Sequence, residues 1–388
     1  MGALPYILDP RSVIMLAGLM GVMMALVMFF MRRSYPPSIR GLSDWARGPL
    51  VAFVSTLLFA ARGFFPDFLT IVVANVVLFQ ACILYYSGSQ KFLQGHSDTR
   101  GWTLLNGVIG LSMFWFSSVK PDFEARLLIV TLAVSLLFFA HALLYLRHRP
   151  RVFGQRLMIG LLLAQAVVAA LRFVSVVMGM AGSNLMEATW IQALYISMYS
   201  ISVLLLSIAV ILMATDRVHT EFEYMATRDS LTGALNRRAL LDACRDAFTS
   251  TSGQQHMALL MVDLDHFKGI NDRFGHQMGD RVLREAVHRM QRAVGDAGLL
   301  GRYGGEEFVV LLPGVGKAEA MAVAARLKQA IDEPFAADSP MAKVGSIAVS
   351  IGVAAREDGR GVDEVLAKAD AALYRAKAMG RDQVMAAA

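Results

Sequence analysis

The distribution of apolar residues constrains this chain more than any other feature of its sequence. A helix needs about 20 apolar residues to cross the hydrocarbon core of a bilayer. Residues 1–213 contain seven runs of about that length, whereas the sequence after residue 213 is charged and interrupted by glycine. The runs are Ser12–Met31, Gly48–Phe65, Phe68–Tyr86, Trp102–Val119, Leu127–Leu146, Leu157–Met178 and Trp190–Met213. The sequence therefore predicts an N-terminal all-α transmembrane bundle of about seven helices, followed by a soluble half.

The composition agrees with a membrane half and narrows the classes of function. Of 388 residues, 56% are hydrophobic and only 18% are charged, a balance unusual for a soluble protein. Cys82 and Cys244 fall in different halves, so neither a disulfide framework nor a Cys/His metal cluster is expected. The net charge of +6 arises largely in loops between apolar runs, and no basic stripe is interleaved with aromatic residues. We therefore expect no nucleic-acid partner.

The positive charges of the loops predict how the chain crosses the membrane. The second run is the weakest candidate, because Arg62 interrupts its end and only Pro66 and Asp67 separate it from the third. Most basic residues lie in the odd-numbered loops: Arg32, Arg33, Arg40 and Arg47, then Lys91 and Arg100, then Arg147, Arg149, Arg151 and Arg156. Loops rich in Lys and Arg stay in the cytoplasm. This pattern predicts a multi-pass membrane protein with its N-terminus outside and its C-terminal half in the cytoplasm.

Two ionisable residues lie inside predicted spans. Such groups are costly in a bilayer and often serve function. His141 is either functional or a hydrogen-bonded packing residue. Arg172 is a counter-charge for a ligand, a member of an internal pair, or a side chain that reaches toward the interface. The sequence does not identify a stimulus, so the ligand or partner of the membrane half stays unknown.

Residues 214–228 are predicted to form a helical linker. The last run continues without Pro or Gly, and Ile211, Val218 and Met225 are spaced by seven. Thr215 and Phe222 occupy the intervening positions. This is about two heptads, fewer than the three or four that identify a coiled coil. The linker is either a signalling stalk between two copies of the chain or a plain spacer.

The soluble half alternates strand and helix patterns. The expected strands are Met257–Leu264, Leu299–Tyr303, Phe308–Leu312 and Ser346–Val353, and the expected helices are Met278–Val294, Ala318–Ile331 and Val362–Met379. Gly304 and Gly305 predict a tight hairpin turn between the second and third strands. The order predicts a ferredoxin-like α+β core.

Two pairs of acids mark a candidate metal site. Asp263 and Asp265 end the first strand, and Glu306 and Glu307 lie in the hairpin. Carboxylates at neighbouring strand ends can converge, and such oxygens suit Mg²⁺ bound together with substrate phosphates. Metals so held support phosphoryl transfer.

At these residues the chain resembles the GGDEF family of diguanylate cyclases. The segment Arg302–Phe308 (RYGGEEF) is similar to the family signature in its GGEEF form. Three further segments, Asp229–Arg238, Asp263–Asp280 and Asp370–Arg381, are similar to the entry motif, the strand–turn–helix motif and the final helix. The resemblance covers residues 229–388 and implies a palm-type GGDEF domain at those residues.

The resemblance also implies a role for each matched residue. Asp263, the carbonyl group of Leu264 and Glu306 would hold Mg²⁺ or Mn²⁺, with Glu307 either a further ligand or structural. Glu306 would also accept the proton of the attacking 3′-hydroxyl. The implied contacts to the guanine come from Asn271, His276 and Asp280, and those to the triphosphate from Lys268, Lys377 and Arg381. Asp265 either contributes to the site or braces the turn.

The implied reaction joins two GTP into cyclic di-GMP and releases two pyrophosphates. One domain binds one GTP, so the resemblance implies a homodimer formed through the linker and the GGDEF domains, under control of the membrane half (residues 1–213). A catalytically silent domain that binds GTP as a receptor or scaffold is the alternative. A transporter would show paired repeats and broken helices, which the spans lack.

One departure from the family concerns feedback. Many members carry an Arg-x-x-Asp product-inhibition site nine and six residues before the first Gly of the signature. Here those positions are Gly295 and Gly298. We therefore expect no feedback inhibition through that site.

Overall fold

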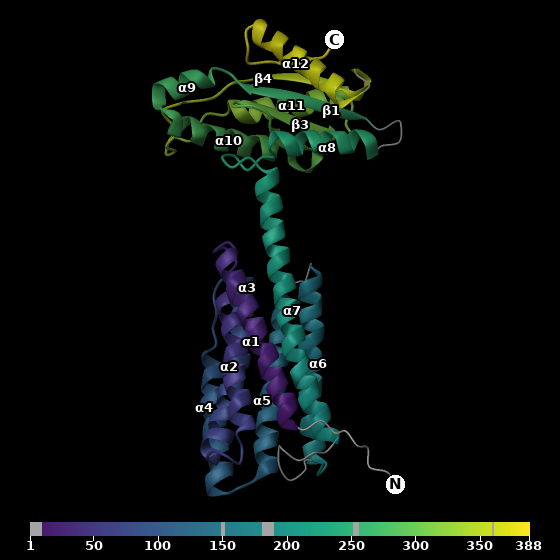
Figure 1. Ribbon diagram of the computed structural model, residues 1–388. Coiled ribbons are helices and arrows are strands. Elements are labelled where there is room, and N and C mark those ends of the chain that lie inside the picture. The colour runs from purple at the N-terminus through teal and green to yellow at the C-terminus, as the bar shows by residue number, and fades with distance from the viewer. Residues whose placement is uncertain (1–9, 149–151, 181–189, 251–255, 359–360) are drawn as a thin grey trace. The chain divides into compact units, whose positions relative to one another are not determined.

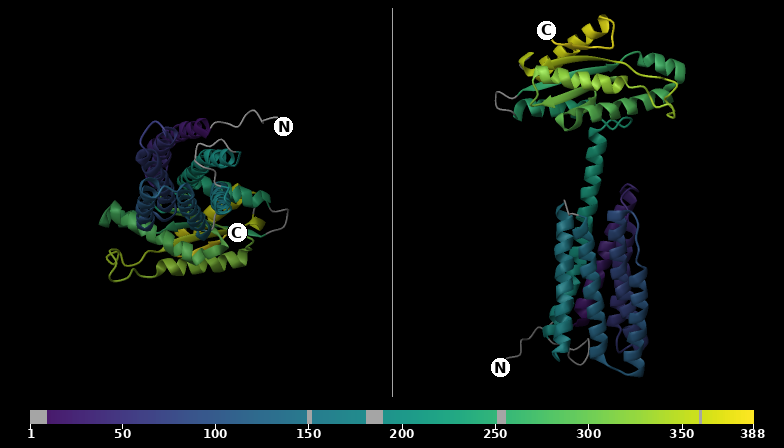
Figure 2. Two further views of the ribbon diagram at one scale, coloured as in Figure 1. Left: turned by 90° about the horizontal axis from the view of Figure 1, so that it is seen from below. Right: turned by 180° about the vertical axis from the view of Figure 1, so that it is seen from behind.

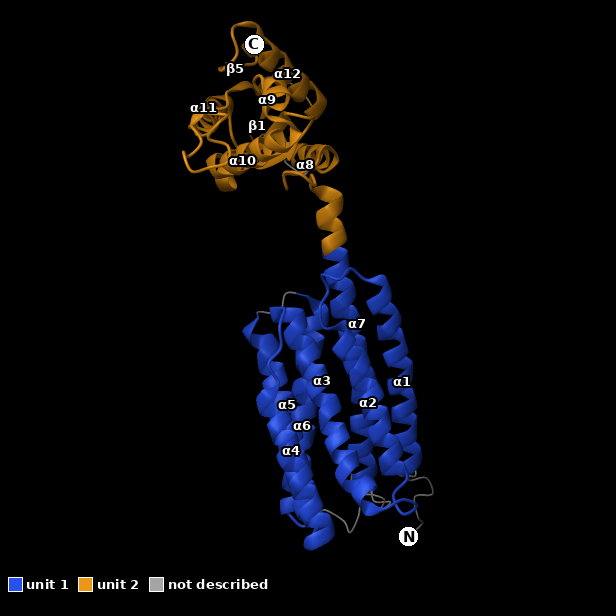
Figure 3. Ribbon diagram, turned by 90° about the vertical axis from the view of Figure 1, so that its left-hand side faces the viewer, with its two compact units in different colours: residues 1–220 blue, residues 221–388 orange. Residues whose placement is uncertain are grey.

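The chain forms two compact units in the computed structural model. The structure describes residues 10–148, 152–180, 190–250, 256–358 and 361–388, so Arg149 and Arg151 of the fifth loop lie outside the described residues. Unit 1 comprises Met1–Thr220 and unit 2 comprises Glu221–Ala388 (Figure 3). The boundary falls within a single helix, α7 (Trp190–Thr227). That helix includes the linker residues, as the absence of Pro and Gly predicts.

Unit 1 is a bundle of long helices that lie side by side (Figures 1 and 2). The helices before α7 are α1 (Pro10–Ser34), α2 (Leu42–Ala60), α3 (Ala74–Gln94), α4 (Arg100–Phe114), α5 (Phe123–Arg147) and α6 (Phe153–Val177). Two π-helical segments extend this set, η1 (Phe68–Val73) before α3 and η2 (Trp115–Val119) after α4. The predicted all-α bundle is confirmed.

Six helices of the described residues are long and apolar enough to cross a membrane, one fewer than the seven predicted runs. The exception is α2, whose first turns carry Asp44, Arg47 and Pro49. The predicted bounds of this run, Gly48–Phe65, were wrong at both ends. The helix begins earlier because Asp44 is buried against α3, where it accepts hydrogen bonds from Ser87 Oγ (2.7 Å) and Lys91 Nζ (2.5 Å). It ends earlier because the chain turns at Gly63, which has a φ of +89°.

Contacts within unit 1 show which loops share an end of the bundle. Arg40 of the first loop donates to the Gly95 carbonyl of the third loop (3.0 Å), and the Tyr35 hydroxyl lies 3.2 Å from Thr215 Oγ1 of α7. At the opposite end, Arg11 at the start of α1 donates to the carbonyl of Arg62 in the second loop (3.0 Å). The helices therefore alternate in direction, and the described basic loops gather at one end.

His141 belongs to a buried hydrogen-bonded group. Its Nε2 lies 2.7 Å from Ser89 Oγ, which also accepts from the Tyr145 hydroxyl (2.9 Å) and from Trp45 Nε1 (3.3 Å). Buried polar atoms that are satisfied in this way fix the packing of helices. These contacts favour the packing interpretation of His141 over a ligand site.

Unit 2 is a five-stranded mixed sheet with helices on both faces. The strands are β1 (Met257–Leu264), β2 (Leu299–Arg302), β3 (Glu307–Pro313), β4 (Val349–Ala355) and β5 (Val384–Ala386), in the order β2-β3-β1-β4-β5. The sheet is antiparallel except for the β4–β5 pair. The helices are α8 (Arg237–Ser250), α9 (Phe267–Phe274), α10 (His276–Val294), α11 (Lys317–Asp332) and α12 (Val362–Ala378). The predicted α+β core is confirmed, and β5 was not anticipated.

Alternation along the central strand builds the three layers. Every residue of β1 is buried. Ala258, Leu260 and Val262 pack toward the core that α10 and α11 cover, whereas Leu259 and Met261 pack toward α8 and α12. Figure 3 shows α8 and α12 on one side of β1, with α10 and α11 on the other. A strand buried on both faces has a continuous apolar sequence, which is why Met257–Leu264 could be recognised.

Candidate active site

The candidate active site of unit 2 lies where three central strands end or begin at the same edge of the sheet. β1 ends at Leu264, which pairs with Val349 at the start of β4. Asp263 pairs with Glu307 at the start of β3. This register brings the two predicted acid pairs to one edge, because antiparallel neighbours place the end of one strand beside the start of the next.

A cation from α12 completes this cluster. Lys377 Nζ lies 2.7 Å from Asp263 Oδ2, and the Asp263 side chain is 8% exposed. Helix α12 can approach the sheet this closely because Gly352 of β4 has no side chain. A Cβ at that position would lie 2.1 Å from the Ala369 carbonyl oxygen and 2.3 Å from the Leu373 nitrogen.

Asp263 and Glu306 at this edge both have raised pKa values. Burial raises the pKa of Asp263 above its ordinary value, and the nearby charge of Asp265 adds to this effect although Lys377 opposes it. Burial and the charges of Asp263 and Glu307 likewise raise the pKa of Glu306. The backbone also brings these acids together, since the Leu264 nitrogen donates to the Glu306 carbonyl (3.2 Å). A group of acids that holds its negative charge at a cost is suited to receive a cation.

Asp265 holds neighbouring segments of the site together through hydrogen bonds. Its carboxylate accepts from Ser350 Oγ (2.9 and 3.0 Å) and from the backbone nitrogen of Asp382 (3.0 Å). These bonds tie the end of β1 to β4 and to the segment that follows α12. Arg381, whose Nε lies 4.0 Å from Asp265 Oδ1, is held in that segment. The structure therefore favours the bracing interpretation of Asp265.

The turn between β2 and β3 is fixed by an arginine. Arg302 donates to the Gly305 carbonyl through Nε (3.1 Å) and Nη2 (2.7 Å), and its Nη1 donates to both carboxylate oxygens of Asp229 (3.0 and 3.2 Å). Space beside Gly305 is open, since an added Cβ would meet no atom within 4 Å. The backbone of this turn is therefore held in place and accessible to a substrate.

A second group of predicted residues lies on α9 and α10, which follow β1. Lys268 is exposed in the first turn of α9, and Asn271 follows on the same helix. The amide of Asn271 lies against Gly279 of α10, where an added Cβ would be 2.0 Å from its Oδ1. His276 is the exposed first residue of α10, and the half-buried Asp280 lies one turn later. The structure thus brings Asn271 beside the first turns of α10.

Comparison with known proteins decides the family. Residues 226–383 match the family described as "Diguanylate cyclase, GGDEF domain". The chain contains a GGDEF domain. Diguanylate cyclase VdcA of Vibrio cholerae is 38% identical over 158 residues, which are 40% of this chain and 46% of that protein. Response regulator PleD of Caulobacter vibrioides is 38% identical over 164 residues, 42% of this chain and 36% of that protein.

Solved structures are similar over the same region. The GGDEF domain of DgcB from Caulobacter crescentus, solved in complex with c-di-GMP, is 35% identical. That match covers 42% of this chain and 96% of the solved chain, with a TM-score of 0.40. The chain spans less than half the length of the curated relatives it matches, and the matched part is the GGDEF domain.

The donor atoms of the GGDEF domain fit a magnesium ion. Among the residues that the structure describes, no three His, Cys, Asp or Glu side chains gather as a metal site of their own. Mg²⁺ at nucleotide sites typically takes one or two carboxylates and completes its coordination with phosphates and water. Asp263 and Glu306 can supply those carboxylates. The pKa of both acids is raised, and a divalent cation between them would favour their ionised forms.

Some functional contacts of the GGDEF domain were not predicted from sequence. The roles of Arg302 and Ser350 could not be foreseen, because each depends on which segments the fold brings together. Asp229, the first residue of the entry motif, braces the turn through its bonds to Arg302. The signal for Arg302 was its place beside the turn, since an arginine next to exposed carbonyl groups can donate several bonds.

We expect Asp229 to stabilise the GGDEF domain only above acidic pH. Burial raises the pKa of Asp229, but the bonds from Thr232 and Arg302 outweigh it and leave the pKa below its ordinary value. A lowered pKa contributes stability above the unfolded pKa and loses it as pH falls through the folded one. Asp229→Asn should lower the free energy of unfolding by about 1–2 kcal/mol at neutral pH. Denaturant titrations should show this difference shrink as pH falls below about 4, through the lowered folded pKa. The exposed Asp296→Asn should not lower the free energy of unfolding at either neutral or acidic pH, and an Asp229→Asn effect that does not shrink as pH falls would contradict this role of Asp229.

Proposed function

We propose that this protein is a membrane-bound diguanylate cyclase that condenses two GTP into cyclic di-GMP and two pyrophosphates. The observation that carries the proposal is the GGDEF domain match at residues 226–383, with both acids of the GGEEF turn beside Asp263. The curated relatives VdcA and DgcM of Escherichia coli are both named diguanylate cyclases. The residues to which the resemblance assigns the metal, the guanine and the triphosphate are all present in this sequence.

The carboxylate cluster is the proposed catalytic centre. Asp263, the Leu264 carbonyl and Glu306 would hold Mg²⁺ or Mn²⁺, with Glu307 the remaining acid of the turn. When bound, the metal stabilises negative charge on the phosphates and favours deprotonation of the attacking hydroxyl. Glu306 accepts the proton of the ribose 3′-hydroxyl, and its raised pKa suits that role. The hydroxyl attacks the α-phosphate of the second GTP, and pyrophosphate leaves.

The basic residues of the site neutralise the triphosphate. Lys377 lies at Asp263 and Arg381 follows in the braced segment after α12. Lys268 is the exposed cation of α9. Charge-assisted bonds from Lys and Arg to phosphate are among the stronger hydrogen bonds in proteins. We propose that these three residues orient the phosphates and stabilise the leaving pyrophosphate.

The residues on α9 and α10 are the proposed guanine site. Asn271 offers both a donor and an acceptor, and Asp280 accepts from the N–H groups of the base. His276 lies between them at the start of α10. This set distinguishes guanine from adenine, because guanine presents adjacent N1–H and N2–H donors to a carboxylate, whereas adenine has an acceptor at N1 and no amino group at C2.

The membrane region and the linker give the reaction its geometry. Six helices apolar enough to cross a membrane indicate a membrane protein. We propose an inner-membrane location, with the GGDEF domain in the cytoplasm beside the basic loops and the N-terminus outside. Residues 214–228 form the signalling helix between the membrane region, residues 1–213, and the GGDEF domain, residues 229–388. Two copies pair through this helix and the GGDEF domains, since each copy binds one GTP.

Nanodiscs that hold a fixed number of copies test whether the active site is shared between two chains. The full chain would be reconstituted into lipid nanodiscs that hold one copy or two copies, and cyclic di-GMP would be measured with GTP and Mg²⁺. We expect product only from discs with two copies, because the nucleophile and the attacked phosphate belong to GTP molecules on different chains. Equal rates per chain in both preparations would contradict a shared site.

We also expect no feedback inhibition through the position of the family's inhibitory motif. At Gly298 an added Cβ would lie 2.4 Å from the Leu311 carbonyl oxygen and 2.6 Å from Leu312 Cδ2, so an aspartate does not fit there. Initial rates should be unchanged when cyclic di-GMP is added at the concentration of GTP. Strong non-competitive inhibition by cyclic di-GMP would count against this prediction. Asp296→Asn is the matched variant, because Asp296 is the one acid between the two glycines, and it should leave the rates unchanged.

A further inference from the structure

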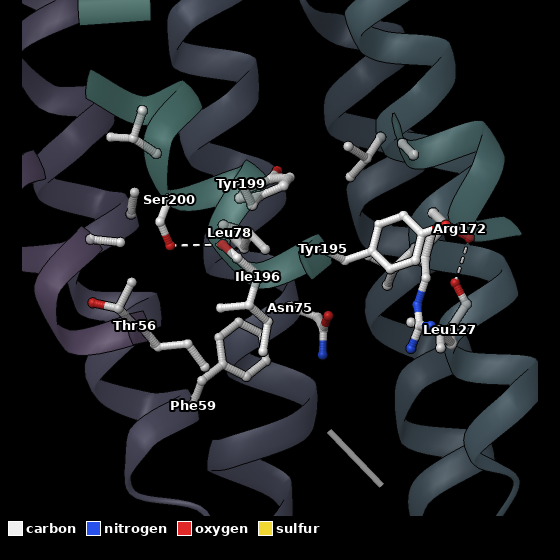
Figure 4. A pocket seen from close by; sticks show the side chains of 18 of the residues that line it. Thr56, Phe59, Asn75, Leu78, Leu127, Arg172, Tyr195, Ile196, Tyr199 and Ser200 are labelled. Carbon is white, nitrogen blue, oxygen red and sulfur yellow. Dashed lines mark hydrogen bonds between the residues drawn. The ribbon is translucent and has the colours of Figure 1, made fainter. Parts of the chain in front are cut away.

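Unit 1 contains a cavity of about 250 Å³ among its helices. Its walls come from η1 and from all seven helices α1 to α7. An engineered apolar cavity of about 150 Å³ is large enough to bind benzene, so this one can hold a longer hydrocarbon. Figure 4 shows its polar wall, with Arg172 beside Tyr195, and the side chains of Asn75, Thr56 and Phe59 around the remaining space.

One end of the cavity is cationic. Three arginines line it, Arg62 just after α2, Arg126 in the first turn of α5 and Arg172 toward the end of α6. These positions share one end of the bundle, because α2 and α6 finish where α5 begins. Arg172 is 5% exposed, donates to Gln192 Oε1 (2.5 Å) and stacks on the Tyr195 ring at 4.9 Å.

Buried polar atoms at this end lack partners among the residues that the structure describes. The Nε atoms of Arg62 and Arg126 are buried with no hydrogen-bond acceptor. Farther into the cavity, level with Ser135 of α5, Gln165 is 6% exposed and its Oε1 has no donor. Unsatisfied buried polar groups are costly and occur mainly where a ligand or water completes them.

The hydrogen-bond donors at the cationic end favour an anion. No Asp or Glu is among the described residues that line the cavity. Asp67 and Asp122 act electrostatically on Arg126 from outside the cavity, and Asp67 also acts on Arg62. The buried Nε–H groups of Arg62 and Arg126 nevertheless have no acceptor among the described residues. Guanidinium N–H groups form strong hydrogen bonds with a carboxylate or a phosphate.

The other end of the cavity is apolar. Its lining there includes Gly21 of α1, Pro49 of α2, Leu78 of α3, Val134 of α5 and Val203 of α7. A ligand that satisfies both ends carries an anionic head and a hydrocarbon body. From this arrangement we propose that unit 1 binds an amphipathic anion, with its carboxylate or phosphate head at Arg62, Arg126 and Arg172 and its chain toward Gly21 and Val203.

Binding to the full chain tests this site without reference to cyclase activity. The protein would be placed in nanodiscs of neutral phosphatidylcholine, with empty discs as the blank, and titrated with decanoate, decanol and decyltrimethylammonium. These probes share a chain and differ in the charge of the head. We expect decanoate to bind at least about tenfold more tightly than either other probe, which corresponds to about 1.4 kcal/mol. Equal affinity for decanoate and decanol would overturn the proposal.

Two variants locate the head and the chain. Arg126→Gln should reduce the preference for decanoate to less than about threefold, about 0.6 kcal/mol, whereas Arg147→Gln at the opposite end of α5 should keep it. Gly21→Ile should abolish the binding of both decanoate and decanol, because the new side chain fills the apolar end of the cavity. Gly21 is suitable because an added Cβ would meet nothing closer than 3.5 Å, whereas at Gly18 it would lie 2.4 Å from Thr56 Oγ1. A preference that survives Arg126→Gln, or decanoate binding that survives Gly21→Ile, would overturn the site.

The source of the anion is distinguished by lipid composition. Adding phosphatidylglycerol to the discs should weaken decanoate binding if a membrane lipid supplies the head and chain. Unchanged decanoate binding would identify a free carboxylate as the ligand. Either result supports the amphipathic anion, whereas tighter decanoate binding in the anionic discs would contradict competition for a cationic site.

Discussion

Replacing Glu306 with glutamine is expected to lower the rate of cyclic di-GMP formation by about 100-fold or more. The substitution keeps the size of the side chain and removes both its negative charge and its capacity to accept a proton. Glu306 lies beside Asp263 at the edge of the sheet, and its raised pKa shows that it holds its charge at a cost. Removing that charge therefore relieves repulsion in the resting protein while it disables the reaction. The fold should not be weakened, so the loss belongs to chemistry.

The measurement is the initial rate with GTP and Mg²⁺, accompanied by thermal unfolding of the same preparations. Glu319→Gln is the matched control, because Glu319 is an exposed glutamate in the first turn of α11, away from the site. It should keep full activity. A Glu306→Gln enzyme that retains more than about a tenth of the activity would remove Glu306 from its role as proton acceptor.

Replacing Gly352 with alanine is expected to destabilise the GGDEF domain by about 3 kcal/mol and to abolish activity. A Cβ there would lie 2.1 Å from the Ala369 carbonyl oxygen and 2.3 Å from the Leu373 nitrogen, both backbone atoms of α12. Neither can turn aside as a side chain could, so α12 must move away from β4. Such a movement would also carry Lys377 away from Asp263, which links this packing contact to the site.

Denaturant unfolding and GTP turnover of the full chain check this expectation together. Gly361→Ala is the matched control, because an added Cβ there would meet nothing within 4 Å and φ is −150°. Its effect on the free energy of unfolding should stay below about 1 kcal/mol. If Gly352→Ala unfolds at the same denaturant concentration as the parent, the close packing of α12 on β4 is not a constraint on this fold.

The parts of this protein that sequence could predict are those governed by local patterns. The apolar runs and the alternation of strands and helices gave the bundle and the α+β core, because burial requires such periodicities. The second run was misplaced because Asp44, a charged residue, is buried inside α2. Its charge is satisfied by Ser87 and Lys91 of another helix, and no local pattern could reveal that pairing.

The candidate site shows the same division. Asp263 and Glu306 stood out because acids at strand ends are recognisable in a sequence. The contact between Lys377 and Asp263 depends on how α12 docks against the sheet, and the bond from Ser350 to Asp265 depends on strand register. The residue types were thus predictable, whereas their partners required the fold. The cationic end of the cavity is a further case, since Arg62, Arg126 and Arg172 are far apart in sequence.

The measurement that tests the central claim most directly is the stoichiometry of products from the purified full chain. The protein, shown to be a dimer in detergent, would be incubated with GTP and Mg²⁺, and both products would be quantified by mass spectrometry. The account predicts one cyclic di-GMP and two pyrophosphates for every two GTP consumed, and product formation slowed by about 100-fold or more when Glu306→Gln replaces the parent. A dimer that binds GTP tightly yet forms no cyclic di-GMP would contradict the account and would favour a GTP-binding receptor or scaffold.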